Sequence, residues 1–369
     1  MASFKVTCVP RNLELLWLQA KDTHHAYNIF HDRDVSEPRC RKGDGGLTFL
    51  LTKKKSTLCE KVMRHIKNVG FEGVLVSVVH KVDHPLITAL VERWRPETNT
   101  FHFPIGEVTV TLHDVQVIWG LPIDGPAVTG KIKMMTLAEH IDHTFDANND
   151  LLCLQRAILA LIGSKLFHDS NTYDISLNYL QYLEDLSCEG RKSWGSTTLA
   201  CLYRNLSKGT MPQRKGIDGG LLLLQYWAWE RMSRIAPRVT PFKEKTSYNY
   251  GECLANKWHG KFSHVQTPAH VLTIYQSFFN ALTNDQFLWT PYTTFIHLLP
   301  RDCTHGQQLW AYIGPLIHWE EVESHLAQRI ARQFGMIQTI PNEVGLMEPQ
   351  EWNSLRDSLR GEDLWSTGV

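Results

Sequence analysis

The sequence predicts a mainly α-helical fold, a compact multi-helix domain with one small β-hairpin or other small β element. In many segments apolar residues recur three or four positions apart, whereas runs with the two-residue alternation of a strand are few. The chain has 369 residues, of which 43% are hydrophobic, and this is enough apolar surface for a large core. Disorder of the whole chain is excluded by the same composition.

Capping signals predict where several of these helices begin and end. Asp83 is expected to cap a helix that has Pro85 in its first turn. Thr111 and Asp114 have the spacing of a capping box, and the helix that follows should end at Gly120. Further helices are expected over residues 58–69, 151–167, 219–232, 268–282 and 319–334, and after a second capping box at Thr136 and Glu139.

Two segments have strand character. The β-branched run FEGVLVSVV, residues 71–79, predicts a strand. The clearest hairpin is TFHF, PIGE and VTVT over residues 100–111, in which Gly106 lies in the turn.

Charge is distributed unevenly although the net charge is zero. Residues 191–245 hold eleven Lys/Arg against three Asp/Glu, and residues 343–363 hold two against six. We expect an irregular N-terminal segment over 1–46, the main domain over 47–341, and an acidic C-terminal segment over 342–369. A globally basic surface is excluded, and neither a membrane span nor a secretory signal is expected.

Cysteine and tryptophan usage also constrains the interpretation. The eight cysteines are widely spaced and none forms a CxxC pair, which favours reduced, mostly buried thiols in the cytosol or nucleus. The twelve tryptophans favour core packing or an interface, and Trp227 and Trp229 are core candidates.

Signatures of catalysis are absent from the sequence. It has no GxxxxGK[ST] phosphate loop, no GxGxxG and no GxSxG. Ser193 and Ser196 are explained as hydroxyl caps at a helix start. Two groups have partial metal-ligand spacing without a complete set of ligands, so no metal or other cofactor is expected: His140 with His143, and Cys253 with His259 and His264.

An alternating charged segment precedes the predicted hairpin. Glu92, Arg93, Arg95 and Glu97 surround Trp94, a pattern suited to bidentate Arg–carboxylate pairs. We interpret these four charges as a structural ion-pair network that ties a helix to the hairpin. The alternative is a recognition site for a phosphate or an acidic peptide.

The basic stretch holds the candidate binding residues. Cations interleaved with aromatic side chains can bind nucleic acid by phosphate contact and stacking, and a solvated surface is the alternative. The candidates for contact with nucleic acid or a partner are Arg204, Lys208, Arg214, Lys215, Arg234 and Arg238.

The segment LITALVERWRPETNTFHFPIGEVTVTLHDVQVIWGLPIDGPAVTG, residues 86–130, closely resembles the signature of the plant mobile domain family, often catalogued as aminotransferase-like. Similar matches follow in family order over residues 13–25, 156–169, 194–206, 219–232 and 315–341.

This resemblance implies a mostly helical, nuclear domain without established catalytic residues. It implies roles in transposon silencing, gene expression and meristem maintenance, with a protein partner that is phosphatase-like or another family member. The expected function is therefore a non-catalytic interaction module. Transposon-derived nucleic-acid binding, with weak contacts, is the first alternative, and an unrecognised enzyme is the second.

Overall fold

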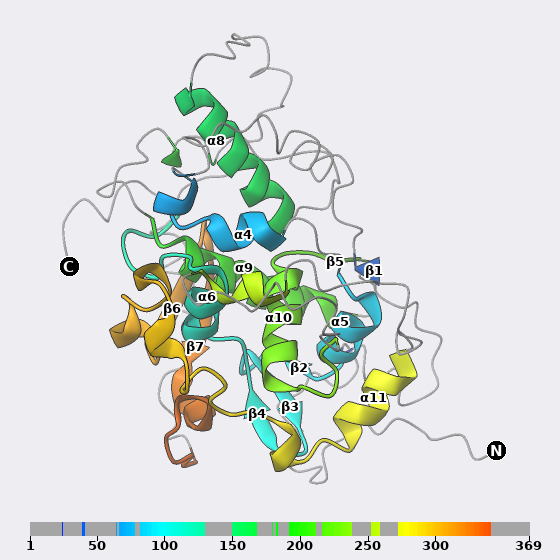
Figure 1. Cartoon of the computed structure of the whole chain (residues 1–369). Helices are drawn as coiled ribbons and strands as arrows, with labels where there is room; N and C mark the ends of the chain where they lie inside the picture. Colours follow the sequence, from blue (N-terminus) through cyan, green and yellow to red (C-terminus); the bar gives the residue numbers. More distant parts are fainter. Residues whose placement is uncertain are drawn as a thin grey trace.

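The structure is a computed structural model, and it describes residues 24, 39–40, 64, 66–77, 82–129, 150–167, 179, 182–183, 192–211, 216–237, 252–258 and 272–340. A helix without a polar face, α10 (Leu221–Arg231), forms its centre, and every residue of α10 is buried. Figure 1 shows α10 between α5 (His84–Val91) and α6 (Leu112–Trp119), with which it is in contact. The mainly helical fold class is confirmed.

The predicted capping residues begin the helices around α10. The Asp83 carboxylate accepts a hydrogen bond from the Leu86 amide at 3.2 Å, which starts α5. At α6 both halves of the Thr111–Asp114 capping box are formed, and the helix ends at Gly120 with a left-handed φ of 67°. These predictions are confirmed, because each depends on residues three or four positions apart.

The remaining helices cover this centre. The predicted helix over 151–167 is α8, which continues as a π-helix, and the 58–69 helix ends as expected at Gly70, where φ is 81°. The second capping box, at Thr136 and Glu139, lies outside the described residues. The elements are α4 (Glu72–Val76), α8 (Asp150–Leu161), η3 (Ile162–Leu166), α9 (Trp194–Gly209), η5 (Leu254–Trp258), α11 (Leu272–Asn280), η6 (Asn284–Gln286), η7 (Ile296–Leu298), η8 (Arg301–Cys303) and η9 (Gln307–Leu309).

The predicted hairpin is present and gains a third strand. β2 (Trp94–Arg95), β3 (Thr100–Phe103) and β4 (Gly106–Val108) form an antiparallel sheet in the order β2-β3-β4. Residues 104 and 105 form the turn, and Gly106 begins β4 directly after it with a φ of 121°, a conformation that favours glycine. In Figure 1 this sheet lies below α10.

The predicted helix over 319–334 is wrong in its first half, since only residues 327–334 are helical and they form a 3₁₀ helix. Residues there form the hairpin of β6 (Ile313–His318) and β7 (Glu321–Leu326), followed by the 3₁₀ helix η10 (Ala327–Phe334). All of β7 except Glu321 is buried, and α9 contacts both strands. Val322 and Leu326 lie four positions apart, which places them on one face of a strand as well as of a helix, so this spacing does not distinguish the two structures. The predicted end at Gly335 is confirmed by its φ of 76°.

The predicted strand over 71–79 is also wrong, since residues 72–76 form α4. A Cβ on Gly73 would lie only 2.5 Å from the Trp119 carbonyl oxygen. This close approach of α4 to the end of α6 shows that tertiary packing overrides the β-propensity of the segment.

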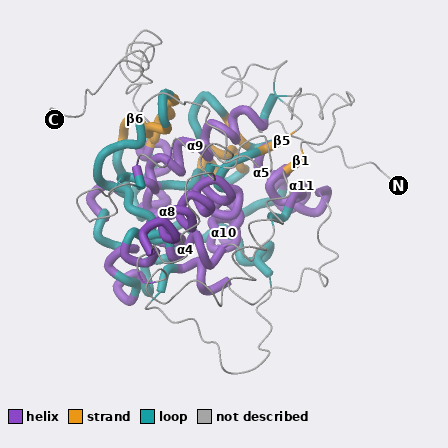
Figure 2. The backbone as a smooth tube through the Cα atoms, turned by 90° about the horizontal axis from the view of Figure 1, so that it is seen from above, coloured by secondary structure: helices purple, strands orange, loops and turns teal. Residues whose placement is uncertain are grey.

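Small sheets flank the helical centre. A short parallel pair joins β1 (Arg39–Cys40) to β5 (Gly216–Ile217). Figure 2, seen from above, again places this pair and β6 at different edges of the helices. One apolar cluster includes Trp94, Trp119, Trp227 and Trp319, which explains much of the tryptophan content. None of the helices in the described part of the chain combines the length and apolar character needed to cross a membrane.

Candidate interaction surface

A fully buried ion pair lies at the junction of α6 and α10. Arg231 Nη2 lies 2.7 Å from Asp114 Oδ1, and neither side chain is exposed. The Thr111 and Tyr292 hydroxyls also donate to Asp114, at 2.7 and 2.8 Å. Burial alone would raise the pKa of Asp114, but the charge of Arg231 and these hydrogen bonds hold it below its usual value.

The same arginine fixes the loop that follows η6. Arg231 Nη1 donates to the carbonyl oxygens of Trp289 at 2.7 Å and Leu288 at 3.3 Å. In return, the Leu288 amide donates to the Arg231 carbonyl oxygen at 2.8 Å. The buried ion pair therefore determines where the Trp289 ring lies at the surface.

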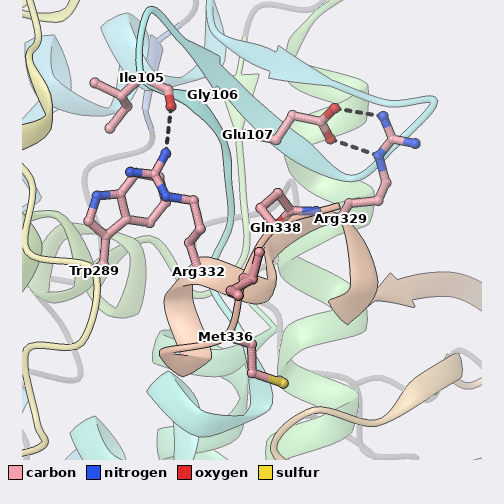
Figure 3. Close-up of a pocket in the computed structure, with 9 residues that line it drawn as sticks. Ile105, Gly106, Glu107, Trp289, Arg329, Arg332, Met336 and Gln338 are labelled. Atoms are coloured by element: carbon pink, nitrogen blue, oxygen red, sulfur yellow. Dashed lines mark hydrogen bonds and ion pairs between the residues drawn. The ribbon is translucent and has the colours of Figure 1, made fainter. Parts of the chain in front are cut away.

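A pocket of about 500 Å³ opens beside this ring, between the β3–β4 turn and the chain that follows β7. Figure 3 shows Arg332 beside the Trp289 ring, with its guanidinium 3.6 Å from the ring centroid. Arg332 also donates to the Ile105 carbonyl oxygen at 3.2 Å and to Asn284 Oδ1 at 2.8 Å. Within the described residues Arg332 has no carboxylate partner.

The neighbouring Arg329 differs in this respect. It makes two parallel hydrogen bonds to the Glu107 carboxylate, at 2.7 and 2.6 Å. Glu107 also accepts a hydrogen bond from the Thr100 hydroxyl at 3.1 Å. The charge of Arg329 is thus compensated within the chain, and the positive character of the pocket comes from Arg332.

The segment that continues beyond the pocket is fixed by hydrogen bonds and exposes apolar side chains. The Gln338 side chain accepts from the Ala331 amide at 2.7 Å and donates to the Gln328 carbonyl oxygen at 2.9 Å. On this backbone the exposed fractions of Met336, Ile337 and Ile340 are 50%, 89% and 93%. We call these three residues the apolar strip.

The predicted binding residues Arg204 and Lys208 lie on α9 and face carboxylates of β7. Arg204 lies 3.2 Å from Glu321 and 3.6 Å from Glu323, and Lys208 lies 3.3 Å from Glu321. Asn99 also donates to Glu323, at 3.2 Å. These two cations therefore join a helix to a strand more than a hundred residues away in the sequence.

The two carboxyl groups of this cluster titrate differently. Burial raises the pKa of Glu323 to about 7, although Arg204 and Asn99 act against the increase. Burial acts in the same direction on Glu321, but hydrogen bonding from His318 and the charges of Lys208 and Arg204 lower its pKa to about 2.

Of the other predicted binding residues, the structure describes only Arg234. Arg234 is exposed in the turn after α10. Arg214, Lys215 and Arg238 lie outside the described residues.

The charged segment before the hairpin contributes to the packing of α11. Glu92 accepts two hydrogen bonds from Gln276, at 2.9 and 3.1 Å, and Arg93 donates to Asn280. Arg95 donates to the Trp94 carbonyl oxygen at 2.9 Å and the Glu92 carbonyl oxygen at 3.3 Å. These three side chains are buried, whereas that of Glu97 is half-buried.

The structure also places the two serines that were predicted to cap a helix. Ser193 occupies the N-cap position of α9, but its hydroxyl donates to the Pro126 carbonyl oxygen at 3.3 Å and caps no helix amide. Ser196 donates to the Ile123 carbonyl oxygen at 2.9 Å. The predicted hydroxyl caps are therefore wrong, because these serines join α9 to the loop that follows α6.

Metal ligands were the other chemical candidates. No group of three His, Cys, Asp or Glu suited to a metal occurs among the described residues. His140, His143, His259 and His264 lie outside that set. Cys201, Cys253 and Cys303 are free and buried, and burial raises the pKa of the Cys253 thiol to about 12, which makes this thiol a poor nucleophile.

The sequence interpretation missed Arg332 and Trp289. They lie 43 positions apart, on η10 and on the loop after η6, and no local motif joins them. The one available signal was the isoleucine pair in GMIQTIP, residues 335–341, which is unusual for a chain segment outside regular structure.

The chain is similar in sequence to proteins of a plant. The chain is 36% identical over 319 residues to the serine/threonine-protein phosphatase 7 long form homolog of Arabidopsis thaliana, covering 77% of this chain and 24% of that protein. It is 32% identical to the protein MAIN-LIKE 1 of the same plant, covering 89% and 67% of the two chains. Identity to the Arabidopsis protein MAINTENANCE OF MERISTEMS is 28%, covering 89% and 71%.

No solved structure matches the chain. The family model described as plant mobile domain matches residues 70–366. That match includes α4 to α11, both hairpins and the pocket beside Trp289. The chain belongs to the plant mobile domain family.

Proposed function

We propose that this chain is a non-catalytic protein-interaction module of the nucleus, which acts in the silencing of transposons and genes. Its partner is a phosphatase-like protein or another family member. The proposal is supported by membership of the plant mobile domain family and by relatives named for meristem maintenance and for phosphatase 7.

The apolar strip is the single observation that carries the interaction role. Ile337 and Ile340 are 89% and 93% exposed on a backbone that Gln338 holds against η10. Exposed apolar side chains beside a pocket are typical of a surface that binds another protein.

The cations of α9 favour a protein over a nucleic acid as the partner. Nucleic-acid affinity increases with the number of phosphates that free cations neutralise. Arg204 and Lys208 already lie next to Glu321, so their charge is compensated within the chain.

Affinity capture of the tagged full chain from plant nuclei tests this function. We expect co-purified proteins to persist after nuclease treatment, and the Ile337→Asp, Ile340→Asp double variant to lose them. Ile274→Asp is the matched control, because Ile274 is also exposed, at 48%, but lies on α11.

Two outcomes would contradict the proposal. A chain excluded from nuclei would contradict the localisation. Capture that nuclease abolishes, with a salt dependence that decreases on charge reversal of Arg214 and Lys215, would instead support nucleic-acid binding.

A further inference from the structure

We propose that the pocket beside Trp289 binds an acidic peptide segment of a partner protein. One carboxylate of that segment pairs with Arg332, and its adjacent large apolar side chains cover the apolar strip. This inference rests on the proposed interaction function and specifies the chemistry of the partner.

Arg332 is already positioned to bind a carboxylate. Stacking on Trp289 at 3.6 Å and hydrogen bonds to Ile105 and Asn284 hold its guanidinium in one orientation. An arginine has five N–H donors, and the structure gives Arg332 two acceptors. Donors therefore remain for an incoming carboxylate, and little side-chain entropy is lost when it binds.

The other cation of the pocket cannot serve in this way. Arg329 is held by both oxygens of Glu107, so a ligand would have to displace a bidentate pair. Phosphate backbones are bound by several cations in series. The one uncompensated guanidinium among the described residues that line the pocket matches a single carboxylate.

The surroundings match a peptide better than a small anion. Met336 and Ile337 line the pocket, and Ile337 and Ile340 extend the apolar surface beyond it. On the opposite side Gly106 begins β4 directly after the β3–β4 turn, and a Cβ placed on it would meet no atom within 4 Å. An extended backbone can therefore pass beside the turn with its apolar side chains against the strip.

The test uses random 12-residue peptides displayed on phage and selected on the immobilised full chain. We expect the enriched peptides to carry Asp or Glu next to Leu, Ile, Met or Phe. Synthetic fluorescein-labelled copies are then titrated by fluorescence anisotropy. Arg332→Gln is expected to weaken binding about tenfold or more, since it removes a charge-assisted hydrogen bond.

Two variants at one exposed position distinguish an effect of charge on peptide binding from an effect on folding. Ile337→Asp should abolish binding of the acidic peptides, whereas Ile337→Lys should preserve much of it, because Lys attracts the same carboxylate. Ile337 is 89% exposed, so neither change threatens the fold. Ile274→Asp on α11 should leave the affinity unchanged.

Four results would overturn this proposal. The first is enrichment of peptides without acidic residues, and the second is affinity that neither Arg332→Gln nor Ile337→Asp alters. The third is binding that occurs only after Glu343 and Glu348 are replaced by Gln, which would identify this chain's own acidic segment as the occupant. Nuclease-resistant capture that is insensitive to Arg332→Gln would leave the proposed function standing and reject this pocket.

Discussion

Arg231 and Arg332 contact the same tryptophan from opposite environments. Arg231 is fully buried, pairs with Asp114 and donates to the Trp289 carbonyl oxygen. Arg332 stacks on the Trp289 ring at the surface, and no carboxylate among the described residues pairs with it. The buried arginine has its charge compensated and stabilises the fold, whereas the surface arginine keeps its charge available for a partner.

The largest expected effect comes from breaking the buried pair. Arg231→Met leaves the Asp114 carboxylate buried without its cation and should lower the free energy of unfolding by about 3–5 kcal/mol, measured by urea denaturation. Asp114→Asn combined with Arg231→Met removes both charges and should recover part of this loss.

Arg329→Met is the matched control for that experiment. Arg329 also forms a bidentate ion pair, but its side chain is 27% exposed, so its loss should cost at most about 1 kcal/mol. Equal losses for Arg231→Met and Arg329→Met would contradict the distinction between buried and exposed pairs.

Arg204 is partly exposed and pairs with Glu323. The pH dependence of the unfolding free energy tests the environment of this carboxyl group. The pKa of Glu323 rises from its usual 4.5 to about 7 on folding, so the folded chain binds this proton more tightly than the unfolded chain. The resulting contribution to stability is complete below pH 4.5 and is lost as the pH rises through 7. Across this window the loss is about 3 kcal/mol.

Comparison with Glu323→Gln isolates this carboxyl group. His113 and His325, whose pKa values burial lowers to about 4, change stability in the opposite direction over part of the same range. The difference in unfolding free energy between wild type and Glu323→Gln cancels their contribution. A difference that does not vary with pH would mean that Glu323 titrates as an ordinary carboxyl group.

The smallest expected effect on stability is that of Arg332→Gln. Loss of a half-buried cation–π contact at the surface should lower the unfolding free energy by about 0.5–1 kcal/mol, measured by urea denaturation beside Arg231→Met. A loss as large as that of Arg231→Met would assign Arg332 to the framework and contradict the comparison.

The parts of the fold that the sequence predicted correctly depend on short-range interactions. The Asp83 cap, the Thr111–Asp114 capping box and the turn at Gly106 each involve residues at most four positions apart. The β6–β7 hairpin and α4 were predicted wrongly because packing against α9 and Trp119 determines their conformation. Local pattern contains no information about such distant partners.

Sequence analysis predicted less of the candidate surface than of the fold. Basic composition drew attention to Arg204 and Lys208, whose acidic partner Glu321 lies more than a hundred residues away. Arg332 acquires its role only when η10 comes to lie beside the loop that Arg231 fixes. Whether an arginine is compensated is a property of the folded chain, and the residue type alone does not reveal it.

The most direct test of the central claim is a paired measurement on Arg332→Gln in the full chain. Nuclease-resistant capture from plant nuclei and thermal melting are compared with those of wild type and Ile274→Asp. We predict that Arg332→Gln loses the captured proteins while its melting temperature stays close to that of wild type. Undiminished capture by Arg332→Gln would contradict the claim that the uncompensated arginine is the recognition residue.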